Sequence, residues 1–151
     1  MNAYMYVAMK EALEGIQHNH GGPFGAVIVK DGDIIARGHN RVVKNNDPTC
    51  HGEIDAIRKA CKKLKTFDLS GCDIYTTGFP CPMCFCAILW ANIDNVYYGC
   101  NTTDTEVIGF RDKAFEESIP DMKRLKCIEV DREDCLELYD IYNKIQNKTH
   151  Y

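Results

Sequence analysis

Residues 51–84 have the sequence HGEIDAIRKACKKLKTFDLSGCDIYTTGFPCPMC, and this stretch decides the fold. Its first part carries apolar residues at the spacing of an amphipathic helix that opens near His51, namely at Ile54, Ile57, Ala60 or Cys61, and Leu64. A short run of β-branched and aromatic residues follows at 73–77 (DIYTT) and predicts a strand. A further helix is predicted from Cys81 through Trp90. Helix, strand and helix in this order indicate an α/β protein.

The residues before this stretch predict a helix and a β-hairpin. Helix formers with apolar residues at the helical period extend from about residue 3 to residue 17, and a Gly-Gly-Pro sequence at 21–23 ends that helix. Two β-branched runs then flank Asp31-Gly32 within GAVIVKDGDIIARGHN, residues 25–40. Because this dipeptide accepts the positive φ of tight turns, we expect an antiparallel hairpin.

Strands and helices continue to alternate after residue 84. Strands are predicted at 95–99 (NVYYG) and 125–130 (LKCIEV), and a closing amphipathic helix is predicted at 133–146 (EDCLELYDIYNKIQ). This order favours a three-layer α/β/α sandwich around a central mixed sheet of about five strands. The 151 residues contain no repeat and no linker rich in Pro, Gly or Ser, so we expect a single domain over 1–151.

Composition and charge narrow the classes of function. Nine cysteines without a secretory signal favour reduced thiols and metal ligation over a disulfide framework. No stretch approaches the roughly 20 apolar residues of a membrane-spanning helix, so we expect a cytoplasmic protein with no membrane partner. The formal net charge of -4 gives no general attraction for a phosphate backbone, although local basic patches such as KACKKLK exist. This favours a small neutral substrate over a nucleic acid.

Two short motifs, each at the start of a predicted helix, carry the chemistry: His51-Gly52-Glu53 and Pro80-Cys81-Pro82-Met83-Cys84. Cysteines three positions apart in a first helical turn lie on one face, so their sulfurs can converge on one ion. The partial positive charge of the helix N-terminus favours the thiolate, which is the form that binds metal. With His51 they make three ligands for a tetrahedral zinc and leave the fourth position open for water.

Glu53 lies two positions beyond the histidine and can supply the proton transfer that hydrolysis also requires. Zinc lowers the pKa of its water to roughly 7, and a carboxylate beside the metal can accept the water proton and pass it to a leaving amine. The interpretation that Glu53 only stabilises the helix start through its charge remains open.

Alternatives for the cysteines also remain open. A Cys-x-x-Cys sequence occurs in redox pairs as well as in zinc sites. Cys50 or Cys86 could complete a closed four-ligand site, and such a site would be structural. The chain would then be a non-catalytic binding module that its metal stabilises.

The pattern His-x-Glu with Pro-Cys-x-x-Cys is the known signature of zinc deaminases, and on these residues the chain resembles the cytidine deaminase superfamily. More narrowly, it resembles the bacterial guanine deaminase branch over residues 45–64, 74–91 and onward through Gly109-Phe110-Arg111-Asp112 to Tyr151. Two departures stand beside the metal ligand: Gly52 replaces the usual Ala, and Cys50 directly precedes His51. Because glycine costs less at a helix start than in a helix interior, we expect a looser backbone but an intact metal site.

The resemblance implies one zinc ion per subunit, held by His51, Cys81 and Cys84. It also implies two catalytic residues. Glu53 would shuttle protons, and Asp112 would contact the amino group that is lost and assist its protonation. Asp112 could instead be a simple turn residue.

The resemblance further implies a purine substrate and a dimer. Asn40 would hydrogen-bond the purine and Phe24 would stack on it, although these residues are also typical of a turn and of a core anchor. Members of the branch are homodimers whose C-terminal segment can cross to the partner's site, where Tyr151 would close over the base. The implied reaction is hydrolytic loss of the amine at purine C2, which converts guanine to xanthine and ammonia. Alternatives are a tRNA-specific adenosine deaminase, which acts on a flipped nucleotide, and a deaminase of guanosine or of a cytosine-type base.

Overall fold

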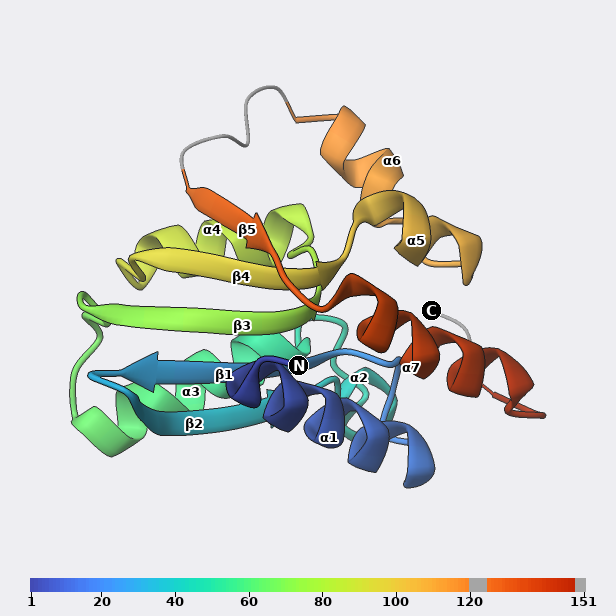
Figure 1. The fold of residues 1–151 in the computed structure, drawn as a ribbon, viewed down its shortest axis with the longest axis horizontal. Helices are drawn as coiled ribbons and strands as arrows, with labels where there is room; N and C mark the ends of the chain where they lie inside the picture. Colours follow the sequence, from blue (N-terminus) through green and yellow to red (C-terminus); the bar gives the residue numbers. More distant parts are fainter. Residues whose placement is uncertain (120–124, 149–151) are drawn as a thin grey trace.

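A computed structural model describes residues 1–119 and 125–148. Its centre is a five-stranded sheet in the order β2-β1-β3-β4-β5 (Figure 1). The strands are β1 (Gly25–Lys30), β2 (Asp33–His39), β3 (Cys72–Gly78), β4 (Asn95–Cys100) and β5 (Lys126–Glu129). β1 pairs antiparallel with β2 and with β3, whereas β3, β4 and β5 run parallel. The expected mixed sheet of an α/β fold is therefore confirmed.

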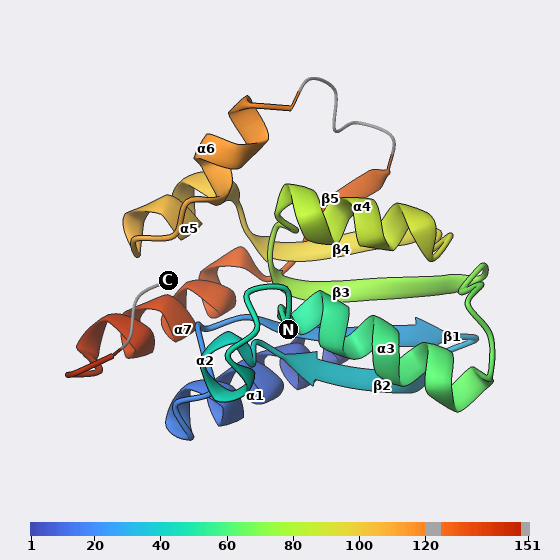
Figure 2. The same cartoon turned by 180° about the vertical axis from the view of Figure 1, so that it is seen from behind.

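Helices cover both faces of this sheet. α1 (Ala3–Gln17) and α7 (Arg132–Lys144) lie on one face, and α3 (Gly52–Leu64) and α4 (Pro82–Trp90) lie on the other (Figures 1 and 2). Successive residues of β1 point to opposite faces. Val27 accordingly belongs to the apolar cluster of α1 and α7, and Ile28 to that of α3 and α4. One apolar core on each face holds the three layers together.

The local elements follow the sequence closely. α1 spans the expected residues 3–17, and the side chain of Asn2 caps it by accepting the N–H groups of Tyr4 and Met5. Asp31 and Gly32 join β1 to β2 with φ angles of 49° and 83°, so the expected hairpin turn is confirmed. None of the helices in the described part of the chain is long and apolar enough to cross a membrane.

Three short helices lie in segments where the sequence pattern predicts none: α2 (Val42–Asn45), α5 (Thr102–Val107) and α6 (Asp112–Glu117). Four to six residues are too few to display a helical period. α5 does carry a local signal, because Asn101 and Asp104 form a capping box in which each side chain accepts the other residue's backbone N–H. α5 and α6 together bring the segment around Phe110 and Asp112 to the edge of the sheet where β4 ends.

The strand directions bring four separate segments to one edge of the sheet. β2, β3 and β4 end there, and the antiparallel β1 begins there. α3 approaches β2 closely at this edge, because a Cβ added at Gly38 would lie 2.5 Å from the backbone nitrogen of Ala56 and 2.5 Å from the carbonyl oxygen of Gly52. Only glycine therefore allows α3 to pack at this distance.

We expect Gly38→Ala to lower the free energy of unfolding by about 1–3 kcal/mol, because the added methyl group overlaps the helix backbone and forces it to shift. Urea unfolding with an unchanged m value measures the effect. Arg37→Ala, which truncates an exposed side chain of the same strand, is the control and should change stability by less than about 0.5 kcal/mol. A Gly38→Ala protein as stable as the wild type would contradict the close approach of α3.

Candidate metal centre and active site

The N-termini of α3 and α4 meet at the edge where β2 and β3 end. His51 is the N-cap of α3 and Cys81 is the N-cap of α4, and neither side chain caps its own helix. Pro82 follows Cys81 at the first helical position, where its missing N–H and fixed φ are favourable. Both N-cap side chains are thus free to take another partner.

One imidazole and two thiols gather at this point. The ligand atoms of His51, Cys81 and Cys84 all lie within 4.8 Å of one another, and His51 Nδ1 is 3.6 Å from Cys81 Sγ. A tetrahedral zinc ion with Zn–N of about 2.0–2.1 Å and Zn–S of about 2.3 Å sets its ligand atoms about 3.6–3.8 Å apart. The donor types and their spacing therefore fit zinc.

No fourth histidine, cysteine or carboxylate joins this group among residues 1–119 and 125–148. Cys86 is exposed on α4, and the Sγ of the buried Cys50 accepts a hydrogen bond from Asn45 Nδ2 at 3.4 Å instead. All nine cysteines are free thiols. A closed four-ligand site with Cys50 or Cys86 is therefore not formed, and the geometry is that of a centre with an open position.

The three ligands differ in protonation before metal binds. Hydrogen bonding from the Cys84 thiol, together with His51, lowers the pKa of Cys81 to about 4 against the opposing effect of burial. Burial also opposes a charged His51, but the hydrogen bond to Cys81 and the thiolate charge outweigh it and raise the pKa of His51 to about 9. The hydrogen bond to Cys81, reinforced by burial, raises the pKa of Cys84 well above its usual range. Without metal, these pKa values correspond to a Cys81 thiolate between a protonated His51 and the Cys84 thiol.

Glu53 and Asp112 meet the metal ligands in a small recess. The recess has a volume of about 20 Å³ and is lined by Phe24, Asn40, His51, Glu53, Phe79, Cys81, Phe110 and Asp112. This volume is close to what a single water needs and is too small for a purine. A wider apolar hollow of about 690 Å³ adjoins the recess, because His51, Cys81, Phe110 and Asp112 line both. A base would therefore need part of the hollow as well as the recess.

In the absence of metal, both carboxyl groups of the recess have raised pKa values. Burial, with a contribution from the Cys81 thiolate, raises the pKa of Glu53 to about 7. The same two causes, in the same order, raise the pKa of Asp112 to about 6. General acids and bases work best when their pKa lies near the working pH. Such shifts in a recess mark these carboxyls as candidate catalytic groups.

Asn40 follows β2 and offers a hydrogen-bond donor to the recess. Its backbone N–H donates to the carbonyl of Phe24 at 2.9 Å, and its Oδ1 accepts the N–H of Val42 at 3.1 Å. Its Nδ2 is buried and has no hydrogen-bond partner within the described residues. A buried amide of this kind calls for an explanation, and a ligand that accepts its hydrogen bond supplies one.

Phe24 precedes β1 and forms one wall of the recess. Its half-buried ring makes edge contacts with Phe110 at a centroid distance of 5.0 Å and with Tyr139 at 6.0 Å. Phe79 and Phe110 also line the recess, although the sequence analysis assigns neither a role. Both adjoin predicted motifs, since Phe79 precedes Pro80-Cys81 and Phe110 precedes Arg111-Asp112. Position beside a motif is thus the signal that identifies them.

The structure brings together seven of the eight site residues expected from the sequence. The recess and the ligand group contain them all, namely Phe24, Asn40, His51, Glu53, Cys81, Cys84 and Asp112. The eighth, Tyr151, lies outside the described residues. Their proximity agrees with the expected roles, which stay predictions.

Comparisons with known proteins agree with this geometry. Residues 1–100 match the family model described as the cytidine and deoxycytidylate deaminase zinc-binding region. A guanine deaminase from Bacillus subtilis is 42% identical over 147 residues, which cover 95% of this chain and 94% of that protein. An X-ray structure of guanine deaminase from Bacillus subtilis superposes with a TM-score of 0.74 at 41% identity and covers 100% of this chain and 99% of that one. A tRNA-specific adenosine deaminase from Aquifex aeolicus is 41% identical over 95 residues, 63% of this chain and 62% of that protein.

The protonation of the metal-free ligands predicts how many protons zinc displaces. At about pH 7.5 His51 and Cys84 each carry a proton that a zinc ligand must lose, whereas Cys81 is already a thiolate. We therefore expect zinc binding to release about two protons from the ligands. Calorimetry in buffers of different ionisation enthalpy counts them, and the Glu53→Gln variant removes any contribution from that carboxyl. Because a zinc-bound water with a pKa of about 7 would add most of a proton at this pH, the count is repeated at about pH 6, where a release near three would mean that Cys81 is a thiol before zinc binds.

Proposed function

This chain belongs to the cytidine and deoxycytidylate deaminase family, and we propose that it is a zinc-dependent deaminase that converts guanine to xanthine and ammonia. The observation that carries the proposal is the recess in which Glu53, Asp112 and the unpartnered amide of Asn40 adjoin the metal ligands. The similarity to a guanine deaminase over nearly the whole chain supports a purine base as the substrate.

We propose that His51, Cys81 and Cys84 hold one zinc ion per subunit. Bound there, zinc acts as a Lewis acid and lowers the pKa of a water at its open position to about 7. The protein supplies the remaining chemistry through groups that move protons and orient the base.

Glu53 accepts a proton from the attacking water and delivers it to the ring nitrogen beside purine C2. A carboxyl beside the metal can perform both transfers, and burial, which raises the pKa of Glu53, opposes the stabilisation of its carboxylate by a bound dication. Asp112 contacts the amino group at C2 and assists its protonation as it leaves. Water adds and ammonia departs, so the balance is guanine plus water to xanthine plus ammonia.

Asn40 and Phe24 orient the base in this proposal. The free Nδ2 of Asn40 donates a hydrogen bond to an acceptor on the purine, and its Oδ1 stays bound to the N–H of Val42. Phe24 stacks on the ring, and the edge contacts with Phe110 and Tyr139 fix its plane. The apolar lining of the recess and hollow, which includes Phe79, Phe110 and Phe115, favours a flat neutral base.

The proposal extends to assembly and location. We propose a homodimer in the cytoplasm, with one deaminase domain over 1–151 and with the C-terminal Tyr151 closing over the base of the partner's site. The nine free thiols support a reducing compartment. Size-exclusion chromatography with light scattering tests the dimer, and loss of guanine binding in a Tyr151→Ala variant tests the closing residue.

A tRNA-specific adenosine deaminase is the second candidate, because the zinc-binding part of the chain also resembles such an enzyme. That activity would require a basic surface for the phosphate backbone. The acidic first turn of α7, with Glu133 and Asp134, and the net charge of -4 favour a small base instead.

We expect the purified zinc-loaded protein to release ammonia from guanine and not from adenine, guanosine, cytosine or tRNA.

Replacing Glu53 by Gln should lower kcat for guanine by about 10²- to 10⁴-fold while the zinc content stays at the wild-type level, since only proton transfer is lost. An ammonia assay and elemental analysis measure the two quantities. Turnover of another substrate without turnover of guanine would overturn the substrate assignment, and an unaffected Glu53→Gln variant would indicate a purely structural zinc.

We expect Asp112→Asn to lower kcat for guanine by about 10²-fold or more, because the amide keeps the shape of the carboxyl but cannot donate a proton to the leaving amine. Zinc content and melting temperature should stay close to those of the wild type. Glu116→Gln, on the same short helix but not lining the recess, is the control. Equal activity of the two variants would remove Asp112 from the mechanism.

A further inference from the structure

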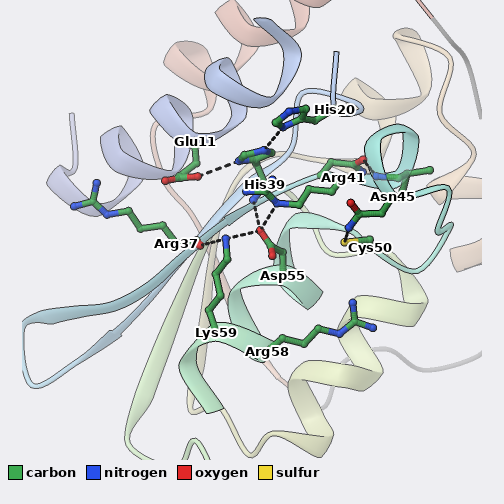
Figure 3. Close-up of polar contacts among 12 residues, drawn as sticks. Glu11, His20, Arg37, His39, Arg41, Asn45, Cys50, Asp55, Arg58 and Lys59 are labelled. Carbon is green, nitrogen blue, oxygen red and sulfur yellow. Dashed lines mark hydrogen bonds and ion pairs between the residues drawn. The ribbon is translucent and has the colours of Figure 1, made fainter. Parts of the chain in front are cut away.

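A network of polar contacts joins His39 and Arg41, the two sequence neighbours of Asn40, to residues of α1 and α3 (Figure 3). Neither His39 nor Arg41 lines the recess. His39 and Arg41, which flank Asn40 in the sequence, are both tied to Asp55 of α3. Asp55 lines neither the recess nor the hollow, and the mechanism above gives it no part. It is nevertheless buried, with 8% of its surface exposed, and the loss of solvent needs compensation.

A single oxygen of Asp55 makes all of these contacts. Oδ2 accepts the backbone N–H of His39 at 3.3 Å, the Nε–H of Arg41 at 3.1 Å and the ammonium of Lys59 at 2.8 Å. Lys59, one turn along α3, also donates to the carbonyl of Arg37 at 3.1 Å. Hydrogen bonds to an ionised acceptor are stronger than neutral ones, so this oxygen binds the end of β2 firmly to α3.

His39, at the end of β2, also contacts α1 and the residues that follow it. His39 Nδ1 lies 3.1 Å from Glu11 Oε2, and His39 Nε2 lies 2.8 Å from Nδ1 of His20, whose ring stacks on it (Figure 3). A Cβ at Gly15 would come within 2.7 Å of the His39 ring, so this ring is packed directly on α1. On the far side of Asn40, the N–H of Arg41 donates to the carbonyl of Cys50, next to the metal ligand His51. Within this fixed stretch, residues 39–41, Asn40 is thus the residue whose side-chain donor is buried without a partner.

We propose that Asp55 is a positioning residue for the base: by holding both neighbours of Asn40 to the helix that carries His51 and Glu53, it fixes the free Asn40 donor relative to the metal centre. This inference rests on the proposed function of Asn40 as the group that binds the base. Asp55 acts through Asn40 and does not itself touch the substrate. A donor that is already oriented loses little conformational entropy on binding, and the gain appears in affinity.

α3 carries both Glu53, the proposed proton shuttle, and Asp55, the proposed positioning residue, and the spacing of the two residues explains how one helix can hold both. Glu53 and Asp55 lie two residues apart, and side chains at this spacing face different sides of a helix. Glu53 accordingly lines the recess, while Asp55 reaches the end of β2. A displacement of β2 relative to α3 would therefore separate the base donor from the proton shuttle.

The test compares Asp55→Ala in two backgrounds by steady-state kinetics of the zinc-loaded enzyme with guanine. In the wild-type background we expect kcat/KM to fall about tenfold, mainly through a higher KM, because uniform binding energy is lost. In an Asn40→Ala background the same substitution should change kcat/KM by less than about twofold, since the group through which Asp55 acts is already absent. Asp55→Asn, which keeps an acceptor oxygen, should restore part of the loss and covers the case in which the alanine variant does not fold.

Lys59→Met is the matched control, because it removes one partner of Oδ2 but leaves the bonds to His39 and Arg41. We expect it to lower the melting temperature without the rise in KM. Equal losses of kcat/KM from Asp55→Ala in both backgrounds would overturn the proposal. So would a lower melting temperature or zinc content with an unchanged KM, because a merely structural role predicts that result.

A readout without turnover separates this inference from the proposed function. The side-chain amide of Asn40, assigned by comparison with Asn40→Asp, should give one sharp pair of NMR signals in the zinc-loaded wild type and shifted or broadened signals in Asp55→Ala. If the wild type does not deaminate guanine, the proposed function fails, and these signals still decide whether Asp55 positions Asn40. Identical Asn40 signals in Asp55→Ala and the wild type would overturn the positioning role.

Discussion

The pairing of the Cys81 thiolate with His51, at the point where two helix N-termini meet, is the interaction on which the rest of the site depends. Burial raises the pKa values of Glu53 and Asp112, and the thiolate raises them further because both carboxyls lie near its negative charge. A dication among the ligands reverses this balance, since it replaces the protons of His51 and Cys84 and attracts the carboxylate of Glu53. A zinc ion held by these side chains would therefore set the protonation of the recess and would stabilise the fold that forms it.

The direction of β1 explains why one recess can combine groups so far apart in the sequence. Because β1 is antiparallel to β2 and β3, its first residues lie where those strands end, and Phe24 comes to face the metal ligands. The start of α3 packs tightly on this segment: a Cβ at Gly52 would lie 3.0 Å from the carbonyl oxygen of Phe24 and 3.4 Å from the Cα of His39. The glycine between His51 and Glu53 thus permits a close approach of the start of α3 to the segments that carry Phe24 and Asn40.

Much of this architecture could be predicted from local chemistry, but the contacts between distant segments could not. The turn at Asp31-Gly32 and the first turns at His51 and Cys81 follow from residues within a few positions of one another. The spacing of His51, Cys81 and Cys84 was enough to predict that these three side chains come together. The order of the strands and the reach of Asp55 across to His39 depend on contacts between distant segments, for which a single sequence carries no pattern. The helices α5 and α6 are too short to display a helical period, although the capping box of α5 is a local signal.

The unpartnered amide of Asn40 gives the recess a means of choosing its ligand. A base that accepts a hydrogen bond from Nδ2 satisfies a donor that is otherwise buried without a partner, whereas a ligand without a suitably placed acceptor leaves it unsatisfied. Leaving such a group unpaired costs about 1–3 kcal/mol, which corresponds to roughly a 5- to 150-fold difference in affinity. Sites built on polar groups therefore discriminate between ligands of similar shape more strongly than apolar walls do. For a base that occupies the recess and part of the hollow, as proposed above, the aromatic lining would favour a planar ring, and the donor of Asn40 would discriminate among the rings that fit.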